Sequence, residues 1–289
     1  MTQWHDIRDP NDPELDQLAA QYHLHPLHVE DCRHRNQNAK IEEDHGYVFT
    51  VLKPVRVTKD GSLEAADLDI FLGRDFVITV QESDCPELRR LLDQIRPASA
   101  NLRADQLFYK ITDAVIDSYL PVLDHFDDVI DELEDTVLEH ASPQALSRIF
   151  ETKKSLILLR RVLVNTRDVA AHLQRSESDL IQRDLWPFLR DVYDHVARNL
   201  DTVEMQRDLL AGSLDVYLSS VANRTNQVMK VLTVLGTIAL PALVISGIYG
   251  MNVKGLPWLD SPHAAAVVGA IMAALTVTLL VILKLFRWF

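Results

Sequence analysis

Two long apolar runs near the C-terminal end dominate the hydrophobic pattern of this chain. Residues 231–253 are 23 consecutive positions without a charge, and residues 264–283 are a second uncharged run of 20. At about 1.5 Å per helical residue, either run reaches across the ~30 Å hydrocarbon core of a bilayer. Residues 1–225 are strongly charged instead. The pattern therefore predicts a large water-soluble part followed by two membrane-spanning helices.

The first hundred residues alternate between helical and extended patterns. Residues 10–22 carry apolar side chains at helical spacing, and residues 47–52 are the β-branched and aromatic types that are typical of a strand. Residues 68–72 and 76–80 predict two more strands, joined by a tight turn in which Gly73 is expected to supply a positive φ. We expect a mixed α/β unit here.

From about Ala104 the apolar spacing becomes helical. Residues 105–139 place apolar side chains at steps of three and four, interrupted only by Pro121. Ser142 and Pro143 are typical of a helix start, and that helix is expected to run to about Gln174. From Phe188 no strong turn signal appears before the end of the first apolar run. One helix on the order of 90 Å long is therefore predicted to lead into the bilayer.

These elements divide the chain into a soluble part, two spans and short connections. Two spans return the chain to its starting side, and the Lys and Arg residues that flank them fit the positive-inside rule. Both termini are therefore expected in the cytoplasm and the spans in the inner (plasma) membrane. The predicted division is a cytoplasmic α/β domain at 1–103, a cytoplasmic helical hairpin at 104–183, a stalk helix at 184–230, a pore-lining transmembrane helix at 231–253, an external loop at 254–263, a second transmembrane helix at 264–283 and a cytoplasmic tail at 284–289.

Charge narrows the classes of function. The formal net charge of -13 argues against nucleic acid as a partner, because phosphate binding needs clustered Lys and Arg. Residues 124–139 carry many acids and no Lys or Arg, which predicts either an ordinary solvated helix face or a surface that attracts cations. No nucleophile elbow, phosphate loop or paired-histidine metal motif occurs, so the chain is not expected to be an enzyme.

The first span is the better candidate for lining a pore. Two helices cannot enclose a water-filled path, so transport would require several subunits around a common axis. Small and hydroxyl-bearing side chains along this span allow close helix packing. One of its faces would form a polar entrance and a long apolar neck that could gate by dewetting, and the alternative is a plain helix-packing seam. The positions on this face are Asn226, Met229, Thr233, Gly236, Leu240, Leu243, Gly247 and Gly250.

The end of the first run, Tyr249-Gly250-Met251-Asn252, resembles the Gly-Met-Asn signature of the CorA family of divalent-cation channels. The stretches 25–31, 191–195 and 215–233 are also similar to that family, so the resemblance covers nearly the whole chain. It implies an α+β cytoplasmic domain with a long stalk helix plus two C-terminal transmembrane helices, assembled as a homopentameric funnel around a central pore. It further implies that Gly250, Met251 and Asn252 form the selectivity filter and that Asn226 marks the inner mouth. A ring of neutral oxygens suits hydrated Mg²⁺, which gives up its inner water reluctantly.

The resemblance also implies regulatory metal sites between neighbouring cytoplasmic domains. The family's carboxylates match Asp31 with Asp191, and Glu30 with Asp113, in this chain. Bound Mg²⁺ would bridge acids that otherwise repel and would hold the subunits closed. Mg²⁺ is thus implied both as the transported and as the regulatory ion. For each acid alone, an ordinary surface carboxylate is the alternative.

The connection after the signature departs from the family pattern. Many magnesium importers have an acidic loop there. In this chain the loop has the positive Lys254, and Asp260 is its only acid. External attraction for cations is therefore weakened. The leading interpretation is a Mg²⁺ channel that also passes Co²⁺ or Ni²⁺. A zinc transporter of the ZntB type, proton-coupled or not, is the alternative, and a membrane-tethered sensory or scaffolding protein without transport is a third.

A group of potential zinc ligands lies near the N-terminus. A helix starting at Pro26 would scatter these side chains around its axis. We therefore expect solvated or hydrogen-bonded histidines rather than a metal site. The group comprises His23, His25, His28, Glu30, Asp31, Cys32 and His34.

Overall fold

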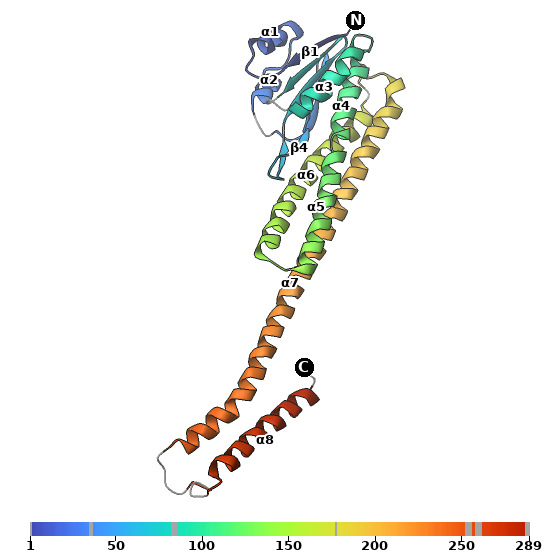
Figure 1. Cartoon of the computed structure of the whole chain (residues 1–289). Coiled ribbons are helices and arrows are strands. Elements are labelled where there is room, and N and C mark those ends of the chain that lie inside the picture. Colours follow the sequence, from blue (N-terminus) through green and yellow to red (C-terminus); the bar gives the residue numbers. More distant parts are fainter. Residues whose placement is uncertain are drawn as a thin grey trace. The chain divides into compact units, whose positions relative to one another are not determined.

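The structure, a computed structural model, describes residues 2–34, 37–81, 86–176, 178–251, 256–257 and 262–286 of the 289. The chain divides into two compact units, Met1–Asp215 and Val216–Phe289 (Figure 1). Its elements are β1 (Gln3–Ile7), α1 (Pro13–Tyr22), α2 (Pro26–Arg33), β2 (Lys40–Asp44), β3 (Tyr47–Leu52), β4 (Val55–Val57), β5 (Leu63–Ala65), β6 (Leu68–Gly73), β7 (Phe76–Gln81), α3 (Pro86–Ser99), α4 (Ala104–Asp117), α5 (Leu120–Glu139), α6 (Pro143–Arg175), a short 3-10 turn (Arg183–Leu185), α7 (Trp186–Tyr249) and α8 (Ala264–Leu285).

A five-stranded sheet forms the centre of the first unit, in the order β1-β7-β6-β3-β2. The β1 strand runs parallel to β7, and the other neighbouring pairs are antiparallel. All six residues of β3 and of β6 are buried, which explains why both strands are mostly apolar on their two faces rather than alternating; Asp69 of β6 is the charged exception. The strands β4 and β5 form a separate antiparallel hairpin.

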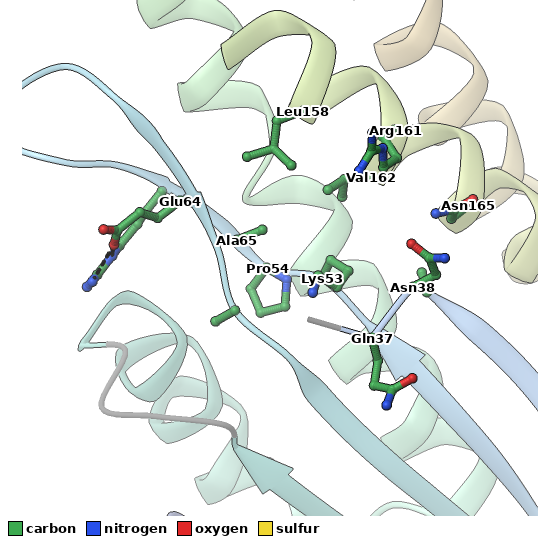
Figure 2. A pocket seen from close by; sticks show the side chains of 13 residues that line it. Gln37, Asn38, Lys53, Pro54, Glu64, Ala65, Leu158, Arg161, Val162 and Asn165 are labelled. Atoms are coloured by element: carbon green, nitrogen blue, oxygen red, sulfur yellow. Dashed lines mark hydrogen bonds and ion pairs between the residues drawn. The ribbon is translucent and has the colours of Figure 1, made fainter. Parts of the chain in front are cut away.

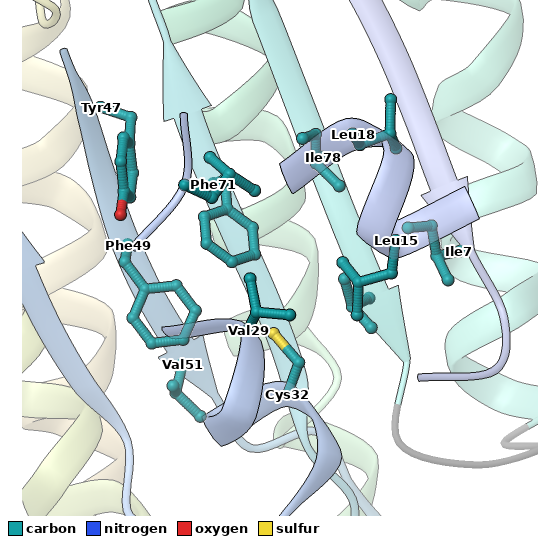
Figure 3. Close-up of a cluster of buried hydrophobic side chains, with 12 residues drawn as sticks. Ile7, Leu15, Leu18, Val29, Cys32, Tyr47, Phe49, Val51, Phe71 and Ile78 are labelled. Atoms are coloured by element: carbon teal, nitrogen blue, oxygen red, sulfur yellow. The ribbon is translucent and has the colours of Figure 1, made fainter. Parts of the chain in front are cut away.

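Helices cover both faces of this sheet. Figure 3 shows Leu15 and Leu18 of α1 beside Ile7 and Ile78 of the strands, and Val29 of α2 beside Phe49 and Phe71. On the other face α4 packs against β6 and β7. The unit is therefore a three-layer α/β/α arrangement, in agreement with the mixed α/β unit expected from the sequence.

The turn between β6 and β7 corrects one expectation. Gly73 does not have a positive φ; among the described glycines only Gly46 and Gly61 do. A Cβ atom on Gly73 would instead lie 2.1 Å from a ring carbon of Phe76. The glycine is needed because the aromatic ring lies against the backbone, and not because of the turn conformation.

The helical segment at 105–139 is two helices rather than one. The α4 helix ends at Asp117 and α5 begins at Leu120, with Pro121 in its first turn, where the missing N–H costs nothing. Tyr119, at the junction, is fully buried and donates a hydrogen bond of 3.0 Å to the backbone carbonyl of Lys53. The interruption therefore falls just before the proline and is fixed by a buried tyrosine.

Below the sheet in Figure 1, three long helices pack against one another: α5, α6 and the first part of α7. The cap predicted for α6 is confirmed, since the Ser142 hydroxyl accepts a hydrogen bond from the backbone N–H of Ala145 at 3.2 Å. Part of the acidic face of α5 is engaged by its neighbours: Glu132 pairs with Arg148 of α6 at 2.8 Å, and Asp127 accepts from Gln206 of α7 at 2.7 Å.

The second unit contains the two apolar helices. Residues 216–249 of α7 and the whole of α8 belong to it, and α7 and α8 are long and apolar enough to cross a membrane. The α7 helix ends at Tyr249 and α8 runs from Ala264 to Leu285, two residues beyond the predicted end.

Candidate metal centre

Three potential metal ligands converge where α4 passes α7. Asp113 and Asp117 lie four residues apart on α4 and so share one face of that helix, while His195 comes from α7. One ligand atom from each residue lies within 4.8 Å of the other two. The opposite stripe of α4, with Leu107 and Ile111, is buried in the core, and this leaves the acidic stripe to face α7.

His195 links acids on both helices. Its Nδ1 lies 3.7 Å from Asp117 Oδ1, and its Nε2 lies 3.5 Å from Asp191 Oδ2, one turn earlier on α7. A small cavity of about 110 Å³ adjoins this pair, lined by Asp117, Leu120, His195, Arg198 and Asn199. Asp191 is therefore beside the cluster, joined to it through the imidazole.

The cluster holds more negative charge than its protein surroundings balance. Burial, followed by the neighbouring Asp117 carboxylate, raises the pKa of Asp113, although Tyr109 and His195 oppose the shift. Burial and then Asp113 raise the pKa of Tyr109 to about 12. A divalent cation would relieve this crowding of carboxylates.

The donor set fits a divalent metal ion. Carboxylate oxygens suit Mg²⁺, and an imidazole nitrogen is accepted more readily by Co²⁺, Ni²⁺ or Zn²⁺. Asp117 and His195 were not predicted as ligands from the sequence. The spacings 113/117 and 191/195 could have indicated them, but only a contact between α4 and α7 unites the two pairs.

Asp31 and Glu30 lie on α2, outside this cluster. Asp31 Oδ2 is 2.7 Å from Lys40 Nζ, and the same ammonium is 2.6 Å from Glu42. Burial opposes the charge on Lys40, but its hydrogen bonds to Asp31 and Glu42 prevail and raise its pKa. Glu30 is exposed. The pairings of Asp31 with Asp191 and of Glu30 with Asp113 involve two subunits by the family pattern, so they stay predictions.

The histidines at 23–34 are dispersed around α2. His28 is buried, stacks on Phe49 with ring centroids 4.5 Å apart, and has Tyr47 and Glu42 at its two ring nitrogens. His25 caps the start of α2 by accepting from the Leu27 N–H at 3.2 Å. These two side chains thus have structural partners.

The residues predicted to line a pore lie on an exposed face of α7. Met229, Leu240 and Leu243 are 56%, 63% and 68% exposed. The others are exposed as well, except Thr233, which is half-buried and donates its hydroxyl to the carbonyl of Met229. Pro241 is buried on the other side of the helix. These large apolar side chains are thus available for contact with other chains or with lipid.

The residues predicted to form the selectivity filter are only partly described. Gly250 follows the last turn of α7, where a Cβ atom would lie 2.9 Å from the carbonyl oxygen of Ser246, and Met251 is 58% exposed. Asn252 lies outside the described residues, as do Lys254 and Asp260.

Known proteins resemble this chain over nearly its whole length. The family described as CorA-like Mg²⁺ transporter protein matches residues 1–287. The cobalt/magnesium transport protein CorA of Thermotoga maritima is 39% identical over 269 residues, which are 92% of this chain and 77% of that protein. The solved structure of the complete CorA magnesium transporter of Methanocaldococcus jannaschii superposes with a TM-score of 0.84 at 25% identity, over 97% of this chain and 89% of that one.

The zinc alternative has weaker support. The ZntB cytoplasmic domain from Vibrio parahaemolyticus gives a TM-score of 0.60 at 16% identity, over 78% of this chain and 89% of that one, and this likeness shows the fold alone. The family matched over residues 1–287 consists of ion transporters, which confirms that the chain is not an enzyme. The fold, the two apolar helices and the match over nearly the full length together show that the chain belongs to the CorA family of Mg²⁺ transporter proteins.

Proposed function

We propose that this chain forms a homopentamer in the inner (plasma) membrane, with both termini in the cytoplasm, and transports Mg²⁺, with Co²⁺ and Ni²⁺ as further substrates. The observation that carries the proposal is the family match over residues 1–287. The relative named as a cobalt/magnesium transport protein, at 39% identity, supports Mg²⁺ and Co²⁺ as the ions.

The exposed face of α7 supports its role as the pore wall. Several copies of the face that holds Met229, Leu240 and Leu243 would enclose a narrow apolar neck, and such a neck blocks ions when it dewets. Gly250, Met251 and Asn252 would form a ring of neutral oxygens at the outer mouth. Neutral oxygens hold a hydrated cation by hydrogen bonds and release it again, whereas a carboxylate cage would retain it.

Regulation by Mg²⁺ on the cytoplasmic side forms the second part of the proposal. The acids around His195 are crowded, and the raised pKa of Asp113 reflects that crowding. Asp31 and Glu30 of the partner subunit would complete the set of ligands. In a single chain Lys40 holds Asp31, so metal binding would compete with this ion pair. Loss of the ion would leave like charges unbridged and favour an open arrangement.

Transport can be measured with the purified protein in proteoliposomes that enclose a fluorescent Mg²⁺ indicator. We expect Mg²⁺ influx that Asn252→Ala abolishes and that Asn101→Ala, an exposed loop substitution, leaves intact. Absence of flux, or equal flux in both variants, would contradict the proposal. Zn²⁺ uptake that follows an imposed pH gradient, with Mg²⁺ inert, would replace it by transport of the ZntB type.

A further inference from the structure

Two cavities adjoin where the β4–β5 hairpin meets α6, and Leu158 and Arg161 line both of them. The smaller has a volume of about 420 Å³, and Figure 2 shows Leu158 and Val162 of α6 facing Ala65 and Pro54 across it. The larger, about 800 Å³, lies between the turn of the hairpin and helices α5 and α6. We name the larger cavity the hairpin groove. Its side chains that matter for binding are Lys59, His125, Lys154, Ile157, Leu158 and Arg161.

The side chains of the hairpin groove have a net positive charge, whereas the whole chain is net negative. Four Lys and Arg side chains and three acids line it, although the chain as a whole carries a net charge of -13. One of those acids, Glu132, is bound by Arg148 through two hydrogen bonds of 3.1 and 2.8 Å. Within the part of the chain that the structure describes, Lys59, Lys154 and Arg161 have no ion-pair partner. Three cations therefore remain available to an anionic ligand.

The two remaining acids of the groove are bound to nearby hydroxyl groups. Asp60 accepts from the hydroxyls of Thr58 and Ser62 within the hairpin turn. Glu151 accepts from the Ser147 hydroxyl at 2.9 Å, one turn earlier on α6. Neither acid pairs with the three available cations.

The spacing of the cations on α6 indicates the length of the anion. Lys154, Leu158 and Arg161 follow one another at steps of four and three residues, so they share a face of the helix. Lys154 and Arg161 are two turns apart, ~10.5 Å along the axis. The two long side chains could meet at one phosphate group only by converging. A chain of phosphates gives each cation its own group, and Arg in particular favours phosphate oxygens.

The remaining lining suits an uncharged organic group. Ile157 and Leu158 supply apolar surface, and the ring of His125 lies beside them with its Nε2 buried and without a hydrogen-bond partner in the described residues. Ligand sites combine such apolar walls with a few polar groups in volumes of roughly 300–1,000 Å³. The hairpin groove therefore has room for more than the phosphates.

We propose that the hairpin groove binds a nucleoside triphosphate, with the phosphates on Lys154, Arg161 and Lys59 and the base against Ile157, Leu158 and His125. This site is separate from the acids around His195 and from the predicted pore. It adds to the ion-transport function a surface that senses an abundant phosphorylated anion.

The test is calorimetric titration of the full chain in detergent with ATP, tripolyphosphate and inorganic phosphate, each in the presence of EDTA so that metal bridging to the acidic clusters plays no part. We expect saturable ATP binding that Arg161→Glu and Lys154→Glu each weaken roughly tenfold or more. Lys153→Glu is the matched control, because it makes the same charge change on the same helix at an exposed position outside the groove. Arg161→Lys should retain most of the affinity.

Each comparison decides one part of the proposal. No saturable ATP binding, or equal losses in Lys153→Glu and Arg161→Glu, would overturn it. Inorganic phosphate that binds as tightly as ATP would overturn the bridging of two cations. Tripolyphosphate as tight as ATP would overturn the contact with the base. All three side chains are exposed, so these substitutions leave the fold intact, and melting curves of the variants check this.

Discussion

Asp69 is a residue of β6 and is buried in the core of the first unit, where it is 1% exposed. Its Oδ1 has no hydrogen-bond partner in the described residues. Burial raises its pKa to about 7, and the nearby Asp67 and Asp31 add to the shift, whereas Cys32 and Lys53 oppose it. Asp67 itself is held by Lys53 in a buried ion pair. The Asp69 carboxyl is therefore neutral below about pH 7 in the folded chain.

This buried acid predicts a pH dependence of stability. The folded-state pKa of Asp69 lies above the unfolded value of about 3.8, so the folded state binds the proton more tightly. Its favourable contribution is complete below about pH 4 and is lost as the pH rises through about 7. We expect the free energy of unfolding of the first unit to fall across this window by an amount on the order of a few kcal/mol at most. Denaturant unfolding at several pH values, followed by Trp fluorescence, measures it.

Asp69→Asn should remove this part of the pH dependence, because the amide is neutral throughout. Asp135→Asn, on the exposed face of α5, is the matched control and should keep the slope of the parent chain. If Asp69→Asn and the parent show parallel curves between pH 5 and pH 8, the carboxyl is not neutral in the fold.

At the scale of elements, the contact between α4 and α7 creates the candidate metal centre. Asp113 and Asp117 come from one helix, and Asp191 and His195 from another about eighty residues further on. An ion that binds only the folded arrangement stabilises it in proportion to the logarithm of its concentration. Metal binding should therefore protect these two helices together.

We expect Mg²⁺ to slow limited proteolysis of the first unit, and Asp191→Ala to weaken that protection. The carboxylate lies 3.5 Å from His195 and belongs to the charge that the ion would neutralise. Asp194→Ala is the control, because it removes an exposed acid from the same helix without touching the cluster. Equal protection in the two variants would count against a metal site here.

Strong local patterns made several elements predictable. The boundaries of β3 at Tyr47 and Leu52 match the predicted strand, because a run of β-branched and aromatic residues buried on both faces leaves little ambiguity. The edge strands β1 and β2 were missed, because Lys40–Asp44 is mostly charged and shows no apolar face. The pairing of α4 with α7 has no local signal at all, which is why Asp117 and His195 were not found.

At the scale of the whole molecule, the exposed face of α7 is where the proposed assembly would bring subunits together. Met229, Leu240 and Leu243 are more than half exposed in the single chain, beside the small residues of the same helix. We expect a pentamer in native mass spectrometry from detergent. Leu240→Asp should weaken assembly, because it would place several carboxylates around one axis, while Leu275→Asp on α8 serves as the matched apolar control.

A monomer in the parent chain would contradict the proposed assembly. Equal loss of the pentamer in Leu240→Asp and Leu275→Asp would show that α7 has no special position at the axis.

The family and its fold could be predicted from the sequence because the apolar runs and the signature at Gly250 stand together near the end. The subunit contacts could not, since no local pattern distinguishes a pore wall from a packing seam.

The division between the two units falls at Asp215, inside α7, and both apolar segments follow it in chain order. Domains fold as units during synthesis, the N-terminal one first. The first unit can therefore leave the ribosome and begin to fold before the apolar part of α7 has left it. A folded, strongly acidic domain does not pass through a translocation channel, so we expect the order of translation to fix which side of the membrane it occupies before the flanking basic residues can act.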